Sequence, residues 1–142
     1  MKKPKPVAIY WDPTSVLSAL FKDSNSEKAL ITSKKEGIHF ISTLCYAEVC
    51  SMLAEIRKGK ELKEVLIDVA FETLSVGPWR RLNIWPEWNM LISLSKKWSL
   101  KGSTLWHLAS AKTLQKQIPE LTLLTFDREL RAAAEGEGLL SS

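Results

Sequence analysis

Three acidic residues stand in surroundings that are otherwise apolar. Asp12 follows the apolar run 7–11, and Asp127 follows the largely apolar run 121–126. Glu48 is the only charged residue between Ile41 and Ala54. Carboxylates are ligands that Mg²⁺ and Mn²⁺ prefer, and a cation relieves the repulsion between acids that lie close together. Such a site can polarise a phosphodiester and lower the pKa of a bound water, which is the chemistry of hydrolysis.

The elements that must position these acids begin with short strands. Val7–Trp11 contains β-forming residues without polar alternation, as expected of a strand buried on both faces. The spans 38–42 and 121–125 predict two more strands. Ligands of open parallel sheets bind beyond the carboxyl ends of the strands. If the first and last strands are neighbours, Asp12 and Asp127 converge at one edge.

Helical spacing of apolar residues fills the chain between these strands. It predicts helices just after Pro13, over Thr43–Gly59, 62–74, 86–98, about 104–117 and 127–136. Strands that alternate with helices predict a three-layer α/β fold, with a central parallel sheet flanked by helices. A length of 142 residues suits a single domain spanning 1–142.

Each acid also has a plainer interpretation. Asp12 and Asp127 could cap the helices that follow them, a common use of Asp. Glu48 could pair with a Lys or Arg of a neighbouring helix. The residues alone leave these alternatives open.

Four short motifs, in order along nearly the whole chain, resemble the PIN domains found in VapC-type toxins. They are Tyr10–Leu17, Ser42–Val49, Leu105–Ala111 and Leu124–Leu130.

The resemblance implies that Asp12, Glu48 and Asp127 are catalytic carboxylates that bind Mg²⁺ or Mn²⁺. It also implies that the hydroxyls of Thr14 and Thr125 orient these acids; ordinary capping and strand packing are the alternative. The family usually has an Asp three residues before His107, where this chain has Thr104, and no acid lies between Trp88 and Gln117. We therefore expect a weakly bound cation, with Thr104 beside the carboxylates.

Two functions follow from the resemblance. The first is a metal-dependent endoribonuclease of the PIN/VapC type that cleaves single-stranded or structured RNA and is held by a small antitoxin protein. The alternative is a catalytically inactive PIN domain that binds RNA or protein. A phosphatase of the haloacid dehalogenase type would need a second acid two residues after Asp12, where Thr14 stands.

Five of the six tryptophans lie between Trp79 and Trp106. They could stack on unpaired bases, with Arg80, Arg81, Lys96 and Lys97 contacting phosphates. We favour a role in the core and at a subunit interface, and predict a homodimer, which the resemblance also implies. His107 could be a general base, but its apolar helix favours a packed side chain.

The remaining composition predicts a cytoplasmic protein. The net charge of +4 is compatible with RNA but is no stronger evidence than ordinary solubility. Cys45 and Cys50 lie roughly 140° apart on one expected helix, which favours reduced thiols. No stretch approaches the roughly 18–20 apolar residues of a membrane span.

Overall fold

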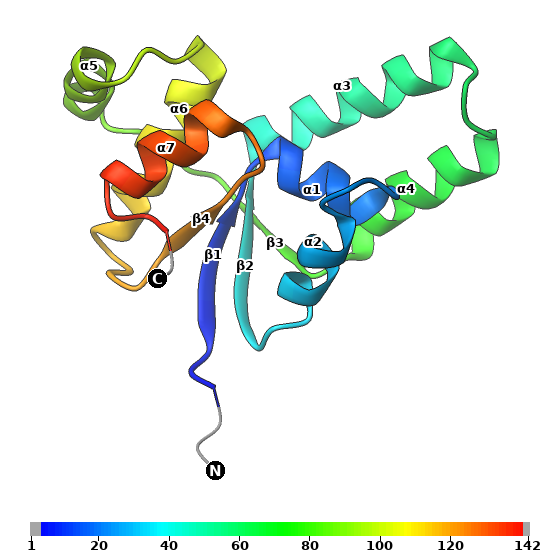
Figure 1. Cartoon of the computed structure of the whole chain (residues 1–142), viewed down its shortest axis with the longest axis horizontal. Helices are drawn as coiled ribbons and strands as arrows, with labels where there is room; N and C mark the ends of the chain where they lie inside the picture. Colours follow the sequence, from blue (N-terminus) through cyan, green and yellow to red (C-terminus); the bar gives the residue numbers. More distant parts are fainter. Residues whose placement is uncertain (1–3, 141–142) are drawn as a thin grey trace.

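A four-stranded parallel sheet forms the centre of the molecule, with the strand order β3-β2-β1-β4 (Figure 1). The computed structural model describes residues 4–140. The strands are β1 (Val7–Trp11), β2 (Gly37–Ser42), β3 (Trp79–Leu82) and β4 (Thr122–Leu124). Because β1 lies between β2 and β4, the carboxyl ends of three neighbouring strands meet at one edge.

Helices cover both faces of this sheet. They are α1 (Pro13–Leu20), α2 (Ser26–Ser33), α3 (Thr43–Gly59), α4 (Glu64–Val76), α5 (Trp88–Lys97), α6 (Gly102–Gln115) and α7 (Arg128–Gly136). The first four lie on one side of the sheet and the last three on the other (Figure 1). The predicted α/β architecture, a parallel sheet flanked by helices, is confirmed.

The alternation of side chains along β1 explains why its sequence is apolar throughout. Ile9 and Trp11 enter the core under α1–α4, whereas Ala8 and Tyr10 enter the core under α5–α7. Successive side chains of a strand point to opposite faces, so a strand covered on both sides needs apolar residues at every position.

Two elements were absent from the sequence prediction. Strand β3 carries two exposed arginines, and only Trp79 of its residues is buried, so its sequence lacks a strand-like apolar run. Helix α2 exposes Leu30 and Ile31 and buries Ala29, which gives no clear apolar stripe. Helices α5 and α6 begin at Trp88 and Gly102, each about two residues from the expected start.

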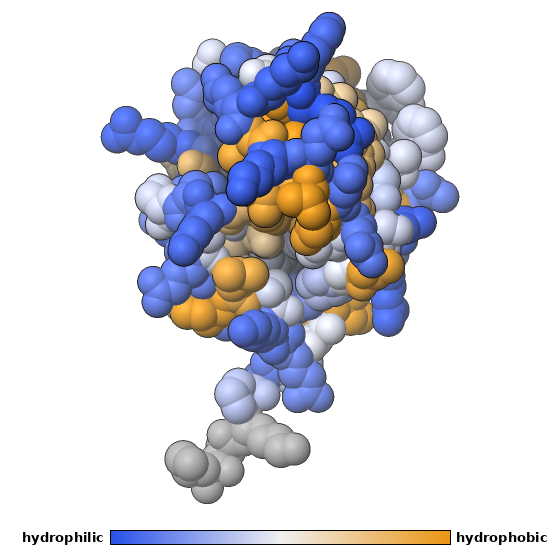
Figure 2. All heavy atoms as spheres, turned by 90° about the vertical axis from the view of Figure 1, so that its right-hand side faces the viewer, coloured by the Kyte–Doolittle hydropathy of each residue, from blue (hydrophilic) through white to orange (hydrophobic). Residues whose placement is uncertain are grey.

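Helix α4 is apolar on two sides. Ile67, Ala70 and Leu74 face the core, while Val65, Val69, Leu66 and Val76 are exposed by between 49% and 75%. Figure 2 views the α3–α4 end of the molecule and shows apolar side chains gathered there among charged ones. Within residues 4–140, none of the helices has the length and apolar character needed to cross a membrane.

Candidate active site

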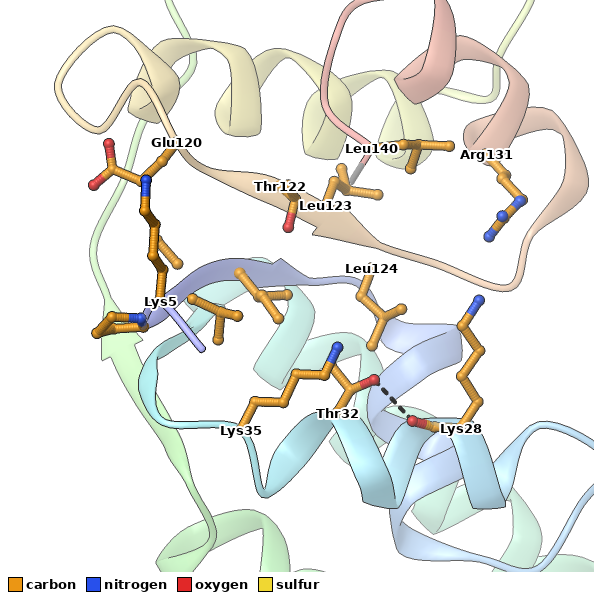
Figure 3. Close-up of a pocket in the computed structure, with 14 residues that line it drawn as sticks. Lys5, Lys28, Thr32, Lys35, Glu120, Thr122, Leu123, Leu124, Arg131 and Leu140 are labelled. Atoms are coloured by element: carbon orange, nitrogen blue, oxygen red, sulfur yellow. Dashed lines mark hydrogen bonds between the residues drawn. The ribbon is translucent and has the colours of Figure 1, made fainter. Parts of the chain in front are cut away.

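One basic cavity lies away from the predicted acids. It has a volume of about 580 Å³ and lies between α2 and the β1–β4 side of the sheet (Figure 3). Its cationic side chains come from three parts of the chain: Lys5, Lys28, Lys35 and Arg131. Glu120 is its only acid among the described residues, and none of the predicted site residues lines it.

Asp12 lies directly after β1 and is 2% exposed. Its Oδ1 accepts hydrogen bonds from the backbone N–H of Ser15 (2.9 Å) and the hydroxyl of Thr14 (2.7 Å), and its Oδ2 accepts from the hydroxyl of Thr125 (2.5 Å). The bond from Ser15 makes Asp12 the N-cap of α1. Both the capping interpretation and the expected contacts with Thr14 and Thr125 are therefore present in the structure.

Burial raises the pKa of Asp12 above its ordinary value, because a charged carboxylate loses hydration there. The hydrogen bonds from Thr125, Ser15 and Thr14 act in the opposite direction and lower that pKa. Within residues 4–140, neither Asp12 nor Glu48 forms an ion pair with a Lys or Arg. The carboxylate of Asp12 is thus held by neutral donors and has no cationic partner among these residues.

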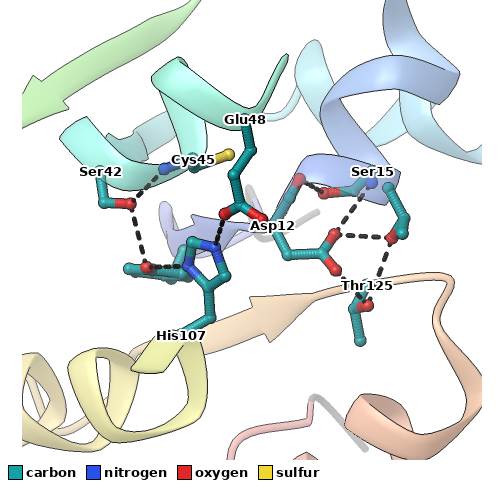
Figure 4. A network of polar contacts seen from close by, with 9 residues as sticks. Asp12, Ser15, Ser42, Cys45, Glu48, His107 and Thr125 are labelled. Atoms are coloured by element: carbon teal, nitrogen blue, oxygen red, sulfur yellow. Dashed lines mark hydrogen bonds and ion pairs between the residues drawn. The ribbon is translucent and has the colours of Figure 1, made fainter. Parts of the chain in front are cut away.

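Glu48 projects from α3 towards the same region (Figure 4). Its side chain is 24% exposed, and its Oε1 lies 2.5 Å from Nε2 of His107 on α6. In the alternative interpretation Glu48 paired with a Lys or Arg of a neighbouring helix; the structure shows a partner on a neighbouring helix, but it is a histidine. Since a carboxylate only accepts hydrogen bonds, Nε2 of His107 is the donor. His107 itself is 2% exposed, as the packed interpretation of this residue requires.

A buried polar chain continues from His107 through the sheet edge. Nδ1 of His107 lies 2.6 Å from the hydroxyl of Tyr10, which donates to the hydroxyl oxygen of Ser42 (3.2 Å). Ser42 also accepts from the backbone N–H of Cys45 (3.0 Å), so Ser42 caps α3 and Thr43 is its first residue. Burial raises the pKa values of Tyr10 and Cys45, and the charges of both Asp12 and Glu48 raise them further. The two carboxylates therefore act on the same small region.

Asp127 is connected to Asp12 through one hydroxyl. The backbone N–H of Asp127 donates to Oγ1 of Thr125 (3.0 Å), and this hydroxyl donates to Asp12. Oδ1 of Asp127 accepts from the N–H of Leu130 (3.0 Å), so Asp127 also caps α7. Thr104 and Asp127 line one cavity of about 330 Å³, together with Lys101, Arg128 and Glu129.

Sequence reasoning missed several members of this arrangement. Ser42 and Tyr10 were not singled out, although Ser42 ends β2 in the way that Asp12 follows β1. The position of Ser42 at a strand end was the available signal. The hydrogen bond between His107 and Glu48 joins residues 59 apart in the chain, and no local pattern indicates it.

The oxygen atoms of these side chains suit a divalent cation that is bound jointly by the protein and a substrate phosphate. Within residues 4–140, no three side chains of acidic, His or Cys type lie close enough together to hold one metal ion. Mg²⁺, however, is commonly held by one or two carboxylates together with water and substrate phosphates. Asp12 and Glu48 can supply two such carboxylates, and Thr104 brings a neutral oxygen to the cavity that it lines with Asp127. The residues fit a cation completed by a phosphate rather than a preformed cage.

Comparison with known proteins relates this chain to others through its structure. No protein-family model matches the sequence, and no curated protein matches it. PAE2754 from Pyrobaculum aerophilum superimposes with a TM-score of 0.63 and 17% identity, over 92% of this chain and 81% of that one. VapC20 of Mycobacterium tuberculosis, a toxin that cleaves the sarcin–ricin loop, gives a TM-score of 0.56 and 10% identity, over 89% and 95%. The chain has the PIN-domain fold.

Proposed function

We propose that this protein is a metal-dependent endoribonuclease of the PIN/VapC type that cleaves single-stranded or structured RNA. The observation that carries the proposal is that Asp12 directly follows β1, that Glu48 projects towards the same region from the helix after β2 (Figure 4), and that neither pairs with a Lys or Arg among the described residues. Asp12 in this position lacks a counter-charge that a divalent cation would supply.

In this proposal Asp12, Glu48 and Asp127 hold Mg²⁺ or Mn²⁺ together with a phosphate of the RNA. When bound, the cation would polarise the phosphodiester and lower the pKa of an attacking water. Thr14 and Thr125 orient Asp12 through their hydroxyls. His107 orients Glu48, because its ring is buried and bonded at both nitrogens.

A second candidate function is an RNA- or protein-binding PIN domain without catalysis. Two observations favour it: Thr104 stands at a position where the family usually has an acid, and no three-ligand metal cluster occurs within residues 4–140. RNA binding without cleavage at any divalent-metal concentration would support this candidate over the nuclease.

The test of the nuclease is cleavage of single-stranded RNA in Mg²⁺ or Mn²⁺ by the wild type and by Asp12→Asn. The substitution keeps the shape of the side chain and removes its charge, so we expect cleavage to be lost. Asp68→Asn is the matched control, because Asp68 is exposed on α4 and pairs with Arg57. A twofold change in rate corresponds to a change of less than ~1 kcal/mol in the activation free energy. If Asp12→Asn cleaved within about twofold of the wild-type rate, the acidic site would not be the catalytic one.

The proposal includes two protein partners. The likeness to a VapC toxin supports a toxin role with a small antitoxin protein; growth arrest on expression of the wild type but not of Asp12→Asn would test the toxin role. The exposed apolar residues of α4 support a homodimer, since a gathered apolar surface that the core does not cover commonly marks an interaction site. Within the tryptophan segment, Trp79 belongs to the core and is not available to an interface.

A further inference from the structure

Two adjoining apolar cavities lie where the chain leaves β3. The first, about 660 Å³, is lined by Thr43, Leu44, Asn83, Ile84, Trp85 and Trp106. The second, about 320 Å³, is lined by Trp85, Pro86, Trp88, Leu91 and Trp106. Trp85 and Trp106 belong to both, so the two cavities form one aromatic groove. This groove lies at the carboxyl edge of the sheet, where parallel sheets bind their ligands.

Two of the three tryptophans of the groove are far more exposed than the remaining tryptophans, while Trp106 is half-buried. Trp85 is 82% exposed and Trp88 is 84% exposed, whereas Trp11 and Trp79 are buried and Trp98 is half-buried, with its ring nitrogen bonded to Glu137. Leaving such large apolar rings in water costs free energy unless a ligand covers them. The packing of the protein does not require Trp85 and Trp88, which points to binding.

The aromatic groove adjoins the acidic site directly. The ring of Trp106 meets the ring of His107 edge-on, with centroids 5.4 Å apart. His107 in turn holds Glu48, and Thr43 of the groove follows Ser42 of the buried polar chain. The groove is thus connected to Glu48 through Trp106 and His107.

We propose that the aromatic groove binds unpaired nucleobases of the RNA substrate, next to the phosphate held at the acidic site. This inference rests on the proposed function in that RNA is the ligand. The groove is lined by flat rings and carries no charged side chain, as suits a base. Lys101 and Arg128 line a separate cavity together with Thr104 and the acids Asp127 and Glu129, and their cationic side chains offer contacts for the phosphates.

The structure favours a nucleobase over a second copy of the chain as occupant. The groove is concave, and its two volumes lie in the range of small-ligand pockets. The exposed side of α4 offers a separate apolar surface for a subunit contact. The bases of duplex RNA are stacked within the helix, so the groove selects single strands or loops.

The test measures the affinity for a short fluorescent single-stranded RNA by fluorescence anisotropy. The buffer contains EDTA, so that no divalent cation is available for cleavage. Trp85→Ala and Trp88→Ala should each weaken binding by roughly fivefold to a hundredfold, the usual value of one stacked base. Trp85→Phe should restore most of the affinity, because it keeps a flat ring. Ile31→Ala is the control, since Ile31 is 58% exposed on α2 and lines neither cavity of the groove. Wild type should prefer the single strand over its duplex and over an abasic strand.

Wild-type affinity in both alanine variants would overturn the inference, as would equal binding of the single strand and the duplex. Light scattering of the same proteins measures their oligomeric state and tests the alternative that the groove is a subunit interface. If the alanine variants turned a wild-type dimer into a monomer and kept RNA affinity, the groove would be a subunit interface and the inference would fall. A wild type that binds through the tryptophans but never cleaves would instead overturn the proposed nuclease and support the groove.

Discussion

At the scale of single residues, Asp12 is a carboxylate kept in a buried place by neutral donors. Its pKa is raised by burial, so the folded state binds a proton more tightly than the unfolded chain. Stability therefore falls as the pH rises from the ordinary value of 3.8 through the folded-state pKa. Above that range the charged Asp12 lowers the free energy of unfolding.

Asp12→Asn should consequently raise the melting temperature of the metal-free protein at neutral pH. The gain should shrink as the pH approaches 3.8, where Asp12 of the wild type takes up its proton. Thermal unfolding in EDTA across this pH range measures the effect, with Asp68→Asn as the exposed control. A variant that is less stable at every pH would contradict the prediction, and would mean that the bonds from Thr14, Ser15 and Thr125 outweigh the cost of burial.

Thr104 is the residue that limits metal affinity in our proposal. A hydroxyl brings a neutral oxygen, so Thr104→Asp adds an anionic ligand and should tighten Mn²⁺ binding by roughly one to a few kcal/mol. RNA cleavage should rise with it. Calorimetry of Mn²⁺ binding decides the first point.

Ser103→Asp is the control for this experiment, because Ser103 is the exposed neighbour on the first turn of α6. It adds the same charge at the same helix end, where acids are generally favourable. Equal Mn²⁺ affinity in Thr104→Asp and wild type would mean that Thr104 does not face the cation. The alignment of the third motif, Leu105–Ala111, with the PIN family would then be wrong.

At the scale of elements, the turn from α2 into β2 depends on one glycine. Gly37 has φ +140°, and a Cβ at this position would lie 2.0 Å from the carbonyl oxygen of Val7, its partner on β1. Gly37→Ala should therefore destabilise the fold by at least about 2 kcal/mol, since the obstacle is backbone. Gly59→Ala is the control: Gly59 ends α3, and an added Cβ meets nothing within 4 Å.

Urea denaturation of the two glycine variants measures this difference. Gly59→Ala should match or slightly exceed the wild type, because Ala is favoured over Gly in a helix by up to ~1 kcal/mol. If Gly37→Ala unfolded at the wild-type urea concentration, β1 and β2 would not be paired in the register described.

The elements that the sequence revealed are those with strong local patterns. Strand β1 could be recognised because both of its faces are buried, and α3 because apolar positions repeat from its cap to Gly59. Strand β3 could not be recognised, because it lies at the edge of the sheet and buries only the side chain of Trp79. Likewise the strand-end position of Asp12 could be predicted, but the bond between Glu48 and His107 depends on how α3 and α6 pack.

At the scale of the whole molecule, the two cores on either side of the sheet bury most of the helices' apolar residues, and the large apolar residues left exposed lie mainly on α2, α4 and α5. We predict a homodimer that buries the exposed side of α4. Isologous contacts are the usual way in which a chain covers such a surface. Light scattering at micromolar concentration should give twice the chain mass of 16.0 kDa.

Replacing Val65 and Val69 with serine should give a monomer, because both side chains are more than half exposed on α4. Trp85→Ala should leave the dimer intact. A wild type that is monomeric without any added partner would remove the prediction.

The buried polar chain that joins the two layers also contains one proton whose NMR signal can report on the acidic site without isotope labelling. The Nε2 proton of His107 lies against Glu48 on a side chain that is only 2% exposed. Such a proton exchanges slowly with water and resonates apart from the backbone amides. Its frequency depends on the charge at Glu48, so one signal would register the arrival of a cation or an RNA phosphate at the carboxylates, independently of turnover.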